Sequence, residues 1–233
     1  MLLHIALVSI TNEVTLAQLA PISAAIQKQI SRDFGPMWNV EATVDAFGKL
    51  EDVPVGYWHV LLQDEISSGA AGLHKRDDNK QPFALVALTT NWPVFMSHEV
   101  LEMLVDPQGT LTRAGNSLKA GQGRVEYLIE VCDPCQASEF AYSVNSVMVS
   151  DFYTPQYFDP VKSSGVHFRG TCEARARSWM VAICRGLIHR LATCSNWRWM
   201  GRRRASPTAA RFRSAPKASA RFPTVFRPID ATR

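Results

Sequence analysis

One imidazole and two carboxylates lie close together in the otherwise apolar segment 94–107. His98 and Glu102 are four residues apart, so on a helix they point to the same side, and Glu99 projects beside His98. In metal sites of the His-Glu-x-x-His kind, the two outer positions bind zinc and the Glu between them takes a proton from water. The spacing is therefore compatible with a metal-binding helix that has His98 and Glu102 as ligands and Glu99 as general base.

The neighbours of these residues indicate that the helix is buried. Apolar side chains surround it almost completely: Val94, Phe95, Met96, Val100, Leu101, Met103, Leu104 and Val105. Carboxylates in such surroundings are costly unless they are paired, protonated or metal-bound. The alternative to a metal site is a core histidine paired with one carboxylate, together with a surface acid. Spacing alone leaves both interpretations open.

Asp106 has the right chemistry for a third ligand but the wrong position. At about 1.5 Å of rise per residue, it lies roughly 12 Å along the helix axis from His98. Pro107 also disfavours helical geometry for the residue before it. We therefore expect Asp106 to end the helix and to brace the following turn, and we expect the third ligand to come from another segment.

A second acidic cluster, in residues 127–135, offers that ligand. Glu130 follows an apolar run that is typical of a buried strand or helix end, and Asp133 lies in a turn before Pro134. Either carboxylate could complete the site. Cys132 and Cys135 have the spacing of a redox pair or of half a four-cysteine zinc site, but no second pair lies at a suitable distance before residue 171. We expect two reduced structural cysteines beside the acidic cluster.

At this point the sequence resembles a bacterial, largely uncharacterised zincin-like family. Its motif is Ser-His-Glu-x-x-Glu-x-x-x-Asp-Pro, followed by Glu-(Ile/Val)-x-Asp and a nearby cysteine. The matching residues are Ser97, His98, Glu99, Glu102, Asp106 and Pro107, then Glu130, Val131, Asp133 and Cys135. The resemblance extends to about residue 170. It implies a zincin-like fold, a zinc ion and a metallopeptidase role on a peptide or protein substrate, and it names no established substrate.

The segments before the helix predict the scaffold that positions these residues. Residues 2–10, 39–47, 57–62 and 83–88 read as strands, and apolar residues from 16 to 30 repeat at helical spacing up to Gly35-Pro36. Turns are expected between the strands, including one at Gly72. The expected fold is α/β (α+β), a mixed sheet with one long covering helix and the His98 helix, and 171 residues are ample for one core.

His74 is a second histidine that could contribute. It lies in an expected loop before a possible edge strand, where a substrate could be held. We interpret it as an exposed loop histidine.

Composition changes abruptly near residue 172. Residues 1–171 hold 11 Lys and Arg against 19 Asp and Glu, whereas residues 172–233 hold 14 against 2, with 13 of the 14 being Arg. Such a tail fits a nucleic-acid-binding arm. It also fits a GC-rich gene read in the wrong frame, because residues 179–186, read from the third codon base, permit Asp-Gly-Gly-Tyr-Leu-Ser-Trp. We favour a native domain over 1–171 and a disordered or frameshifted tail over 172–233, and we do not expect nucleic acid as a partner.

The beginning of the chain gives no sign of targeting. Residues 1–10 lack a basic region and a small-residue cleavage site, so they are expected to form the first strand. Five cysteines, two of them in 1–171, suit a reducing cytoplasm. We expect a cytoplasmic protein with no membrane span. Three classes remain: a zinc-dependent hydrolase, which we favour, a non-catalytic protein with a structural metal or buried polar network, and a nucleic-acid binder.

Overall fold

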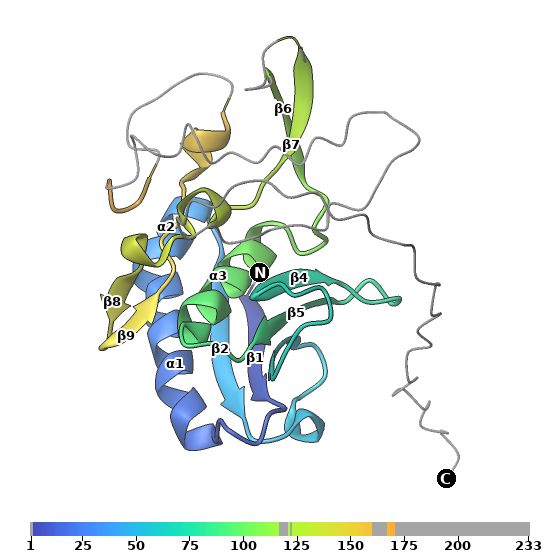
Figure 1. The fold of residues 1–233 in the computed structure, drawn as a ribbon, viewed down its shortest axis with the longest axis vertical. Helices are drawn as coiled ribbons and strands as arrows, with labels where there is room; N and C mark the ends of the chain where they lie inside the picture. Colours follow the sequence, from blue (N-terminus) through green and yellow to red (C-terminus); the bar gives the residue numbers. More distant parts are fainter. Residues whose placement is uncertain (1, 117–120, 122, 160–166, 171–233) are drawn as a thin grey trace, which may run out of the picture. The chain divides into compact units, whose positions relative to one another are not determined.

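The computed structural model describes residues 2–116, 121, 123–159 and 167–170 (Figure 1). The expected domain boundary near 171 and the expected disordered or frameshifted tail lie outside the described residues. Within the described residues, no helix is both long enough and apolar enough to cross a membrane.

The centre of the fold is a mixed five-stranded sheet with the order β2-β1-β3-β5-β4. Its strands are β1 (Leu2–Ser9), β2 (Glu41–Phe47), β3 (Trp58–Gln63), β4 (Gly72–Arg76) and β5 (Pro82–Ala87). The first three and β5 run parallel, and β4 lies antiparallel to β5 at the edge. The α/β fold with a mixed sheet is therefore confirmed. Gly72 begins β4, so the turn expected at this residue is wrong.

The covering helix is longer than its apolar repeat indicates. It comprises α1 (Leu16–Gln29), a π-helical turn η1 (Ile30–Phe34) and α2 (Gly35–Trp38). The end expected at Gly35-Pro36 is wrong, because the chain accommodates Pro36 where the π-helical turn η1 passes into α2. The helix instead ends at Asn39, whose φ of 53° is left-handed. At Gly35 a Cβ would lie 2.6 Å from the Val40 carbonyl oxygen, so only glycine fits.

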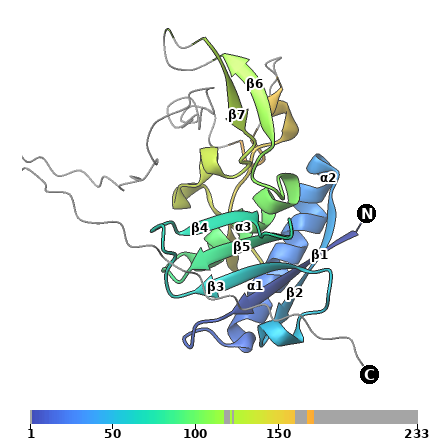
Figure 2. The same cartoon turned by 90° about the vertical axis from the view of Figure 1, so that its right-hand side faces the viewer.

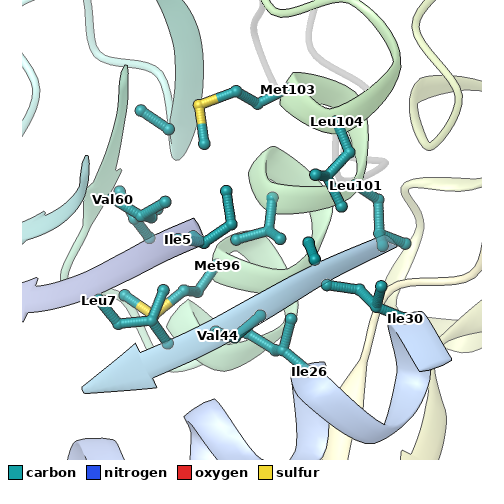
Figure 3. Close-up of a cluster of buried hydrophobic side chains, with 14 of the residues drawn as sticks. Ile5, Leu7, Ile26, Ile30, Val44, Val60, Met96, Leu101, Met103 and Leu104 are labelled. Carbon is teal, nitrogen blue, oxygen red and sulfur yellow. The ribbon is translucent and has the colours of Figure 1, made fainter. Parts of the chain in front are cut away.

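The second helix, α3 (Trp92–Val105), follows β5 directly and carries the His98 motif. Both α1 and α3 pack on one face of the sheet (Figure 2). Figure 3 shows the core between them, where Ile26 from α1, Ile5 from β1 and Leu101 from α3 meet. Because α3 is buried nearly all round, every polar residue of its motif lies in the interior.

The two sheet edges differ. At the β2 edge, the side-chain amide of Gln27 donates to the Ala42 carbonyl at 3.0 Å and accepts from the Val44 amide at 2.7 Å. Ser23 adds a hydrogen bond to the Val44 carbonyl at 2.7 Å. Side chains of α1 thus occupy backbone groups that another strand would use. Within the described residues β4 pairs with β5 alone, and its outer side carries no strand.

One single turn of 3₁₀ helix, η2 (Leu50–Asp52), lies between β2 and β3. The remaining elements follow α3 and are two hairpins and three single turns of 3₁₀ helix: β6 (Thr112–Asn116) with β7 (Arg124–Leu128), β8 (Tyr142–Val144) with β9 (Val147–Val149), η3 (Asp133–Cys135), η4 (Ser138–Phe140) and η5 (Pro155–Phe158). Asp106 ends α3 as predicted, and its Oδ2 accepts a hydrogen bond from the Leu111 amide at 2.7 Å. Ser97 Oγ accepts another from the Ser150 amide at 2.6 Å, which ties the later segment to α3.

Candidate metal centre

Glu102 is the central residue of the cluster on α3. Its Oε2 lies 3.2 Å from His98 Nε2, one helical turn earlier, and 3.6 Å from His74 Nδ1 on β4. Its Oε1 accepts hydrogen bonds from the backbone amides of Cys132 and Asp133 at 3.0 and 3.2 Å. One oxygen is therefore fixed by the backbone, and the other is directed between the two imidazoles.

The charge state of Glu102 follows from these contacts. Burial acts to raise its pKa, but the adjacent imidazoles of His98 and His74 and the Cys132 amide outweigh burial and lower the pKa to about 2. Burial acts against the charged forms of the imidazoles too, yet the surrounding carboxylates raise the pKa of His74 to about 9 and hold that of His98 well above its usual value. Without a cation, the cluster balances its negative charge with protons on nitrogen.

The two carboxylates predicted as alternative third ligands face different histidines. Asp133 Oδ1 lies 3.4 Å from His98 Nε2, and its side chain is 48% exposed. Glu130 Oε2 lies 3.8 Å from His74 Nε2, with 18% of its side chain exposed. Burial, then the neighbouring Glu102 carboxylate, raises the pKa of Glu130 to about 9. The structure thus brings all the predicted site residues into one cluster, although Glu130 and Asp133 lie beside different imidazoles.

His74 corrects one of our expectations, because it is neither exposed nor in a loop. It lies in β4, its side chain is 5% exposed, and Nδ1 is 3.4 Å from Glu99 Oε2. The antiparallel register pairs His74 with Ala84 of β5 and turns the imidazole toward α3. In the sequence, the only indication that His74 belongs to the site was its position before the strand that leads into the motif helix. The orientation of its imidazole depends on the pairing between β4 and β5.

Glu99 is buried against Gly72 at the start of β4. A Cβ on Gly72 would lie 2.9 Å from both Cγ and Cδ of Glu99, so the missing side chain provides the space for this carboxylate. Burial raises the pKa of Glu99, and the imidazoles of His74 and His98 act in the opposite direction. The carboxyl group is therefore a buried proton acceptor next to two nitrogen bases.

Cys132 is the second site residue that sequence reasoning did not assign. Two groups of described residues have ligand atoms that all lie within 4.8 Å of one another: His98 with Glu102 and Cys132, and His74 with Glu102 and Glu130. Cys132 and Cys135 are both buried and are not joined in a disulfide, in line with the expectation of reduced cysteines beside the acidic cluster. Burial, reinforced by Glu102, raises the pKa of Cys132 well above its usual value.

Several ligand atoms in the cluster lack a well-formed hydrogen bond. Among the described residues, the buried atoms Glu99 Oε2, His74 Nε2 and Glu130 Oε2 have no partner of acceptable geometry. Buried polar atoms are nearly always satisfied in folded proteins. Nitrogen, carboxylate and thiolate donors at this separation match the ligands that zinc accepts. The donor set therefore fits a divalent cation.

Comparisons of the chain with protein-family models, with curated proteins and with solved structures found no match.

Proposed function

We propose that this protein is a zinc-dependent hydrolase that cleaves peptide or similar amide bonds. The observation that carries the proposal is the position of Glu102 Oε2, 3.2 Å from His98 Nε2 and beside the buried carboxyl group of Glu99. Two ligands bonded to one zinc ion at about 2.1 Å lie roughly 3.4 Å apart in a tetrahedral arrangement. His98 and Glu102 match that separation without rearrangement, as do His98 and Asp133 at 3.4 Å.

His98 and Glu102 would hold the ion, and Asp133 or Cys132 would complete the set. Glu130, the other predicted candidate, lies beside His74 instead. A bound divalent cation polarises a carbonyl oxygen and makes water easier to deprotonate. Zinc ligands bind in their deprotonated forms, so the protons on the imidazoles would leave when the ion enters.

Glu99 is the residue to which we assign proton transfer. Its Oε2 lies 3.4 Å from His74 Nδ1, and its carboxyl group is near enough to His98 and Glu102 to feel their charge, so it would be close to the proposed ion without being needed as a ligand. A general base works best when its pKa lies near the working pH, and burial raises the pKa of Glu99 in that direction. We assign it the removal of the proton from the attacking water and the transfer of that proton to the leaving amine.

The edge of β4 supports an extended peptide as substrate. The Ala87 amide bonds to the Ala71 carbonyl, and the Asp77 amide bonds to the Gln81 carbonyl. Because backbone groups alternate along an antiparallel pair, the amides and carbonyls of Gly72 and His74 point away from β5. Gly109 lies close to the His74 carbonyl, so a peptide would pair mainly with Gly72, and its backbone would then lie next to Glu99. The β2 edge is unsuitable, since α1 side chains already occupy it.

A structural metal site is the second candidate. The group His98, Glu102 and Cys132 is buried, and closed four-ligand sites are typical of structural zinc. Nucleic-acid binding through the basic tail concerns residues 172–233, which lie outside the described part of the chain. Cys132 and Cys135 are not joined in a disulfide, which suits a reducing compartment, and we place the protein in the cytoplasm.

Two measurements on the full-length chain test the proposal. The first is zinc content by elemental mass spectrometry for the wild type, His98→Ala and Glu102→Ala. We expect at least about one zinc ion per wild-type chain and a lower zinc content in both variants. The second is hydrolysis of a fluorogenic peptide library by Glu99→Gln, with exposed Glu41→Gln as the control. A hydrolase loses at least a hundredfold in turnover in Glu99→Gln while keeping its zinc. Zinc without any hydrolysis by the wild type would support the structural site.

A further inference from the structure

We infer that the cluster binds two divalent cations that share Glu102, one beside His98 and one beside His74. The inference rests on the proposed function and adds a second ion to it. The second site comprises His74, Glu102 and Glu130, whose ligand atoms all lie within 4.8 Å of one another.

Distance separates the two imidazoles. Ligands of one zinc ion, each bonded at about 2.0–2.2 Å, lie at most about 4.4 Å apart. Among the described residues, no group with all ligand atoms within 4.8 Å of one another contains both His74 and His98. As placed, the two histidines therefore cannot complete one coordination sphere with Glu102, although each lies close to Glu102 Oε2.

The shared oxygen sets a short distance between the two ions. Glu102 Oε2 is 3.2 Å from His98 Nε2 and 3.6 Å from His74 Nδ1. Two cations each bonded to this oxygen at about 2.1 Å would lie no more than roughly 4.2 Å apart, within the range of two-metal hydrolytic centres. Both histidines already lie close enough to Glu102 Oε2 for each to bind one of the two ions.

Charge favours two ions over one. Four carboxyl groups, those of Glu99, Glu102, Glu130 and Asp133, lie within 4 Å of an imidazole nitrogen. One dication would leave two of the four negative charges uncompensated when all are ionised, and a second would neutralise the cluster. Three of the four, Glu99, Glu102 and Glu130, are mostly buried, and without a cation their charge is balanced by protons, whose place the ions would take.

Two unsatisfied atoms lie on the side of His74 that faces Glu130. Glu130 Oε2 and His74 Nε2 lie 3.8 Å apart, too far for a hydrogen bond, and neither has a well-formed hydrogen bond with another described residue. His74 is 5% exposed, so water does not easily supply the missing interaction. Because Glu102 Oε2 lies farther from His74 Nδ1, at 3.6 Å, than from His98 Nε2, at 3.2 Å, we expect the second ion to bind more weakly and exchange faster.

Zinc titration of the metal-free full-length chain, followed by native mass spectrometry and calorimetry, tests the inference. We expect two zinc ions in the wild type, and one ion of unchanged affinity, within threefold, in His74→Ala and Glu130→Gln. His98→Ala should lose the tighter ion. His59→Ala removes an imidazole outside the cluster and is the control. Glu130→Gln keeps the shape of the side chain, so it provides the answer even where His74→Ala does not fold.

The outcomes separate this inference from the proposed function. A wild type that saturates at one ion, retained in His74→Ala and Glu130→Gln but lost in His98→Ala, would overturn the second site and leave the hydrolase proposal standing. One ion that is lost in both histidine variants would also overturn it, because a single centre would then use both imidazoles. A folded wild type that binds no ion would overturn the proposed function itself, and this inference with it.

Discussion

Replacing Glu102 by glutamine removes the central charge of the cluster and keeps the shape of the side chain. The pKa of Glu102 is lowered from 4.5 to about 2, so folding favours its ionised form by on the order of 3 kcal/mol. Glutamine resembles the protonated acid. In the metal-free protein at pH 7, we therefore expect Glu102→Gln to lower the free energy of unfolding by on the order of 3 kcal/mol.

Urea denaturation of metal-free protein measures this difference directly, with exposed Glu41→Gln as the matched control. Because the pKa is lowered, the stabilisation from Glu102 is present above about pH 4.5 and disappears as pH falls through about 2. Zinc at a hundred times its dissociation constant should add about 2.7 kcal/mol to the wild type and almost nothing to the variant. A variant within 0.5 kcal/mol of the wild type at pH 7, and equally stabilised by zinc, would refute the central role of Glu102.

Three further outcomes are expected. In denaturant titrations, the metal-free protein should be less stable at pH 9 than at pH 6. The pKa values of His74 and Glu130 are both raised to about 9 in the folded protein, so folding loses the free energy of binding these protons as the pH rises toward 9. With zinc bound, stability should instead rise with pH, because zinc binds the deprotonated ligands. Gly72→Ala should reduce peptide turnover at least tenfold by displacing Glu99, with zinc content unchanged by elemental mass spectrometry. Asp106→Ala should cost about 1 kcal/mol in thermal unfolding, since it removes the hydrogen bond to the Leu111 amide.

Local pattern was sufficient for the helix that carries the motif. The spacing of His98, Glu99 and Glu102 placed all three on α3, and the Asp106-Pro107 pair marked its end, because helical periodicity and proline sterics act over a few residues. The strands followed from short apolar runs between turns. Gly72 and the Gly35-Pro36 pair led to wrong predictions of a turn and of a helix end. Gly72 is needed for its close contact with Glu99, and Gly35 is needed for its close contact with the Val40 carbonyl.

Residues brought in by tertiary contacts could not be read in this way. His74 reaches the cluster only because β4 reverses direction beside β5, and Cys132 reaches it because its backbone amide binds Glu102. Glu130 and Asp133 are three residues apart in an irregular segment, where no periodicity tells which side each one faces. Sequence therefore named both carboxylates but could not assign them to different histidines.

The unequal edges of the sheet also govern how the chain can meet a copy of itself. An open strand edge is a template for another strand, and here α1 blocks one edge while β4 leaves the other available. Association through the edges of the five-stranded sheet can then join two chains at β4 but offers no second open edge of that sheet for a third. In such a pair, the β4 strand of each chain would cover the edge where the other chain would bind a peptide. Self-association would then compete with the substrate, and dilution of the protein would raise its hydrolytic activity per chain.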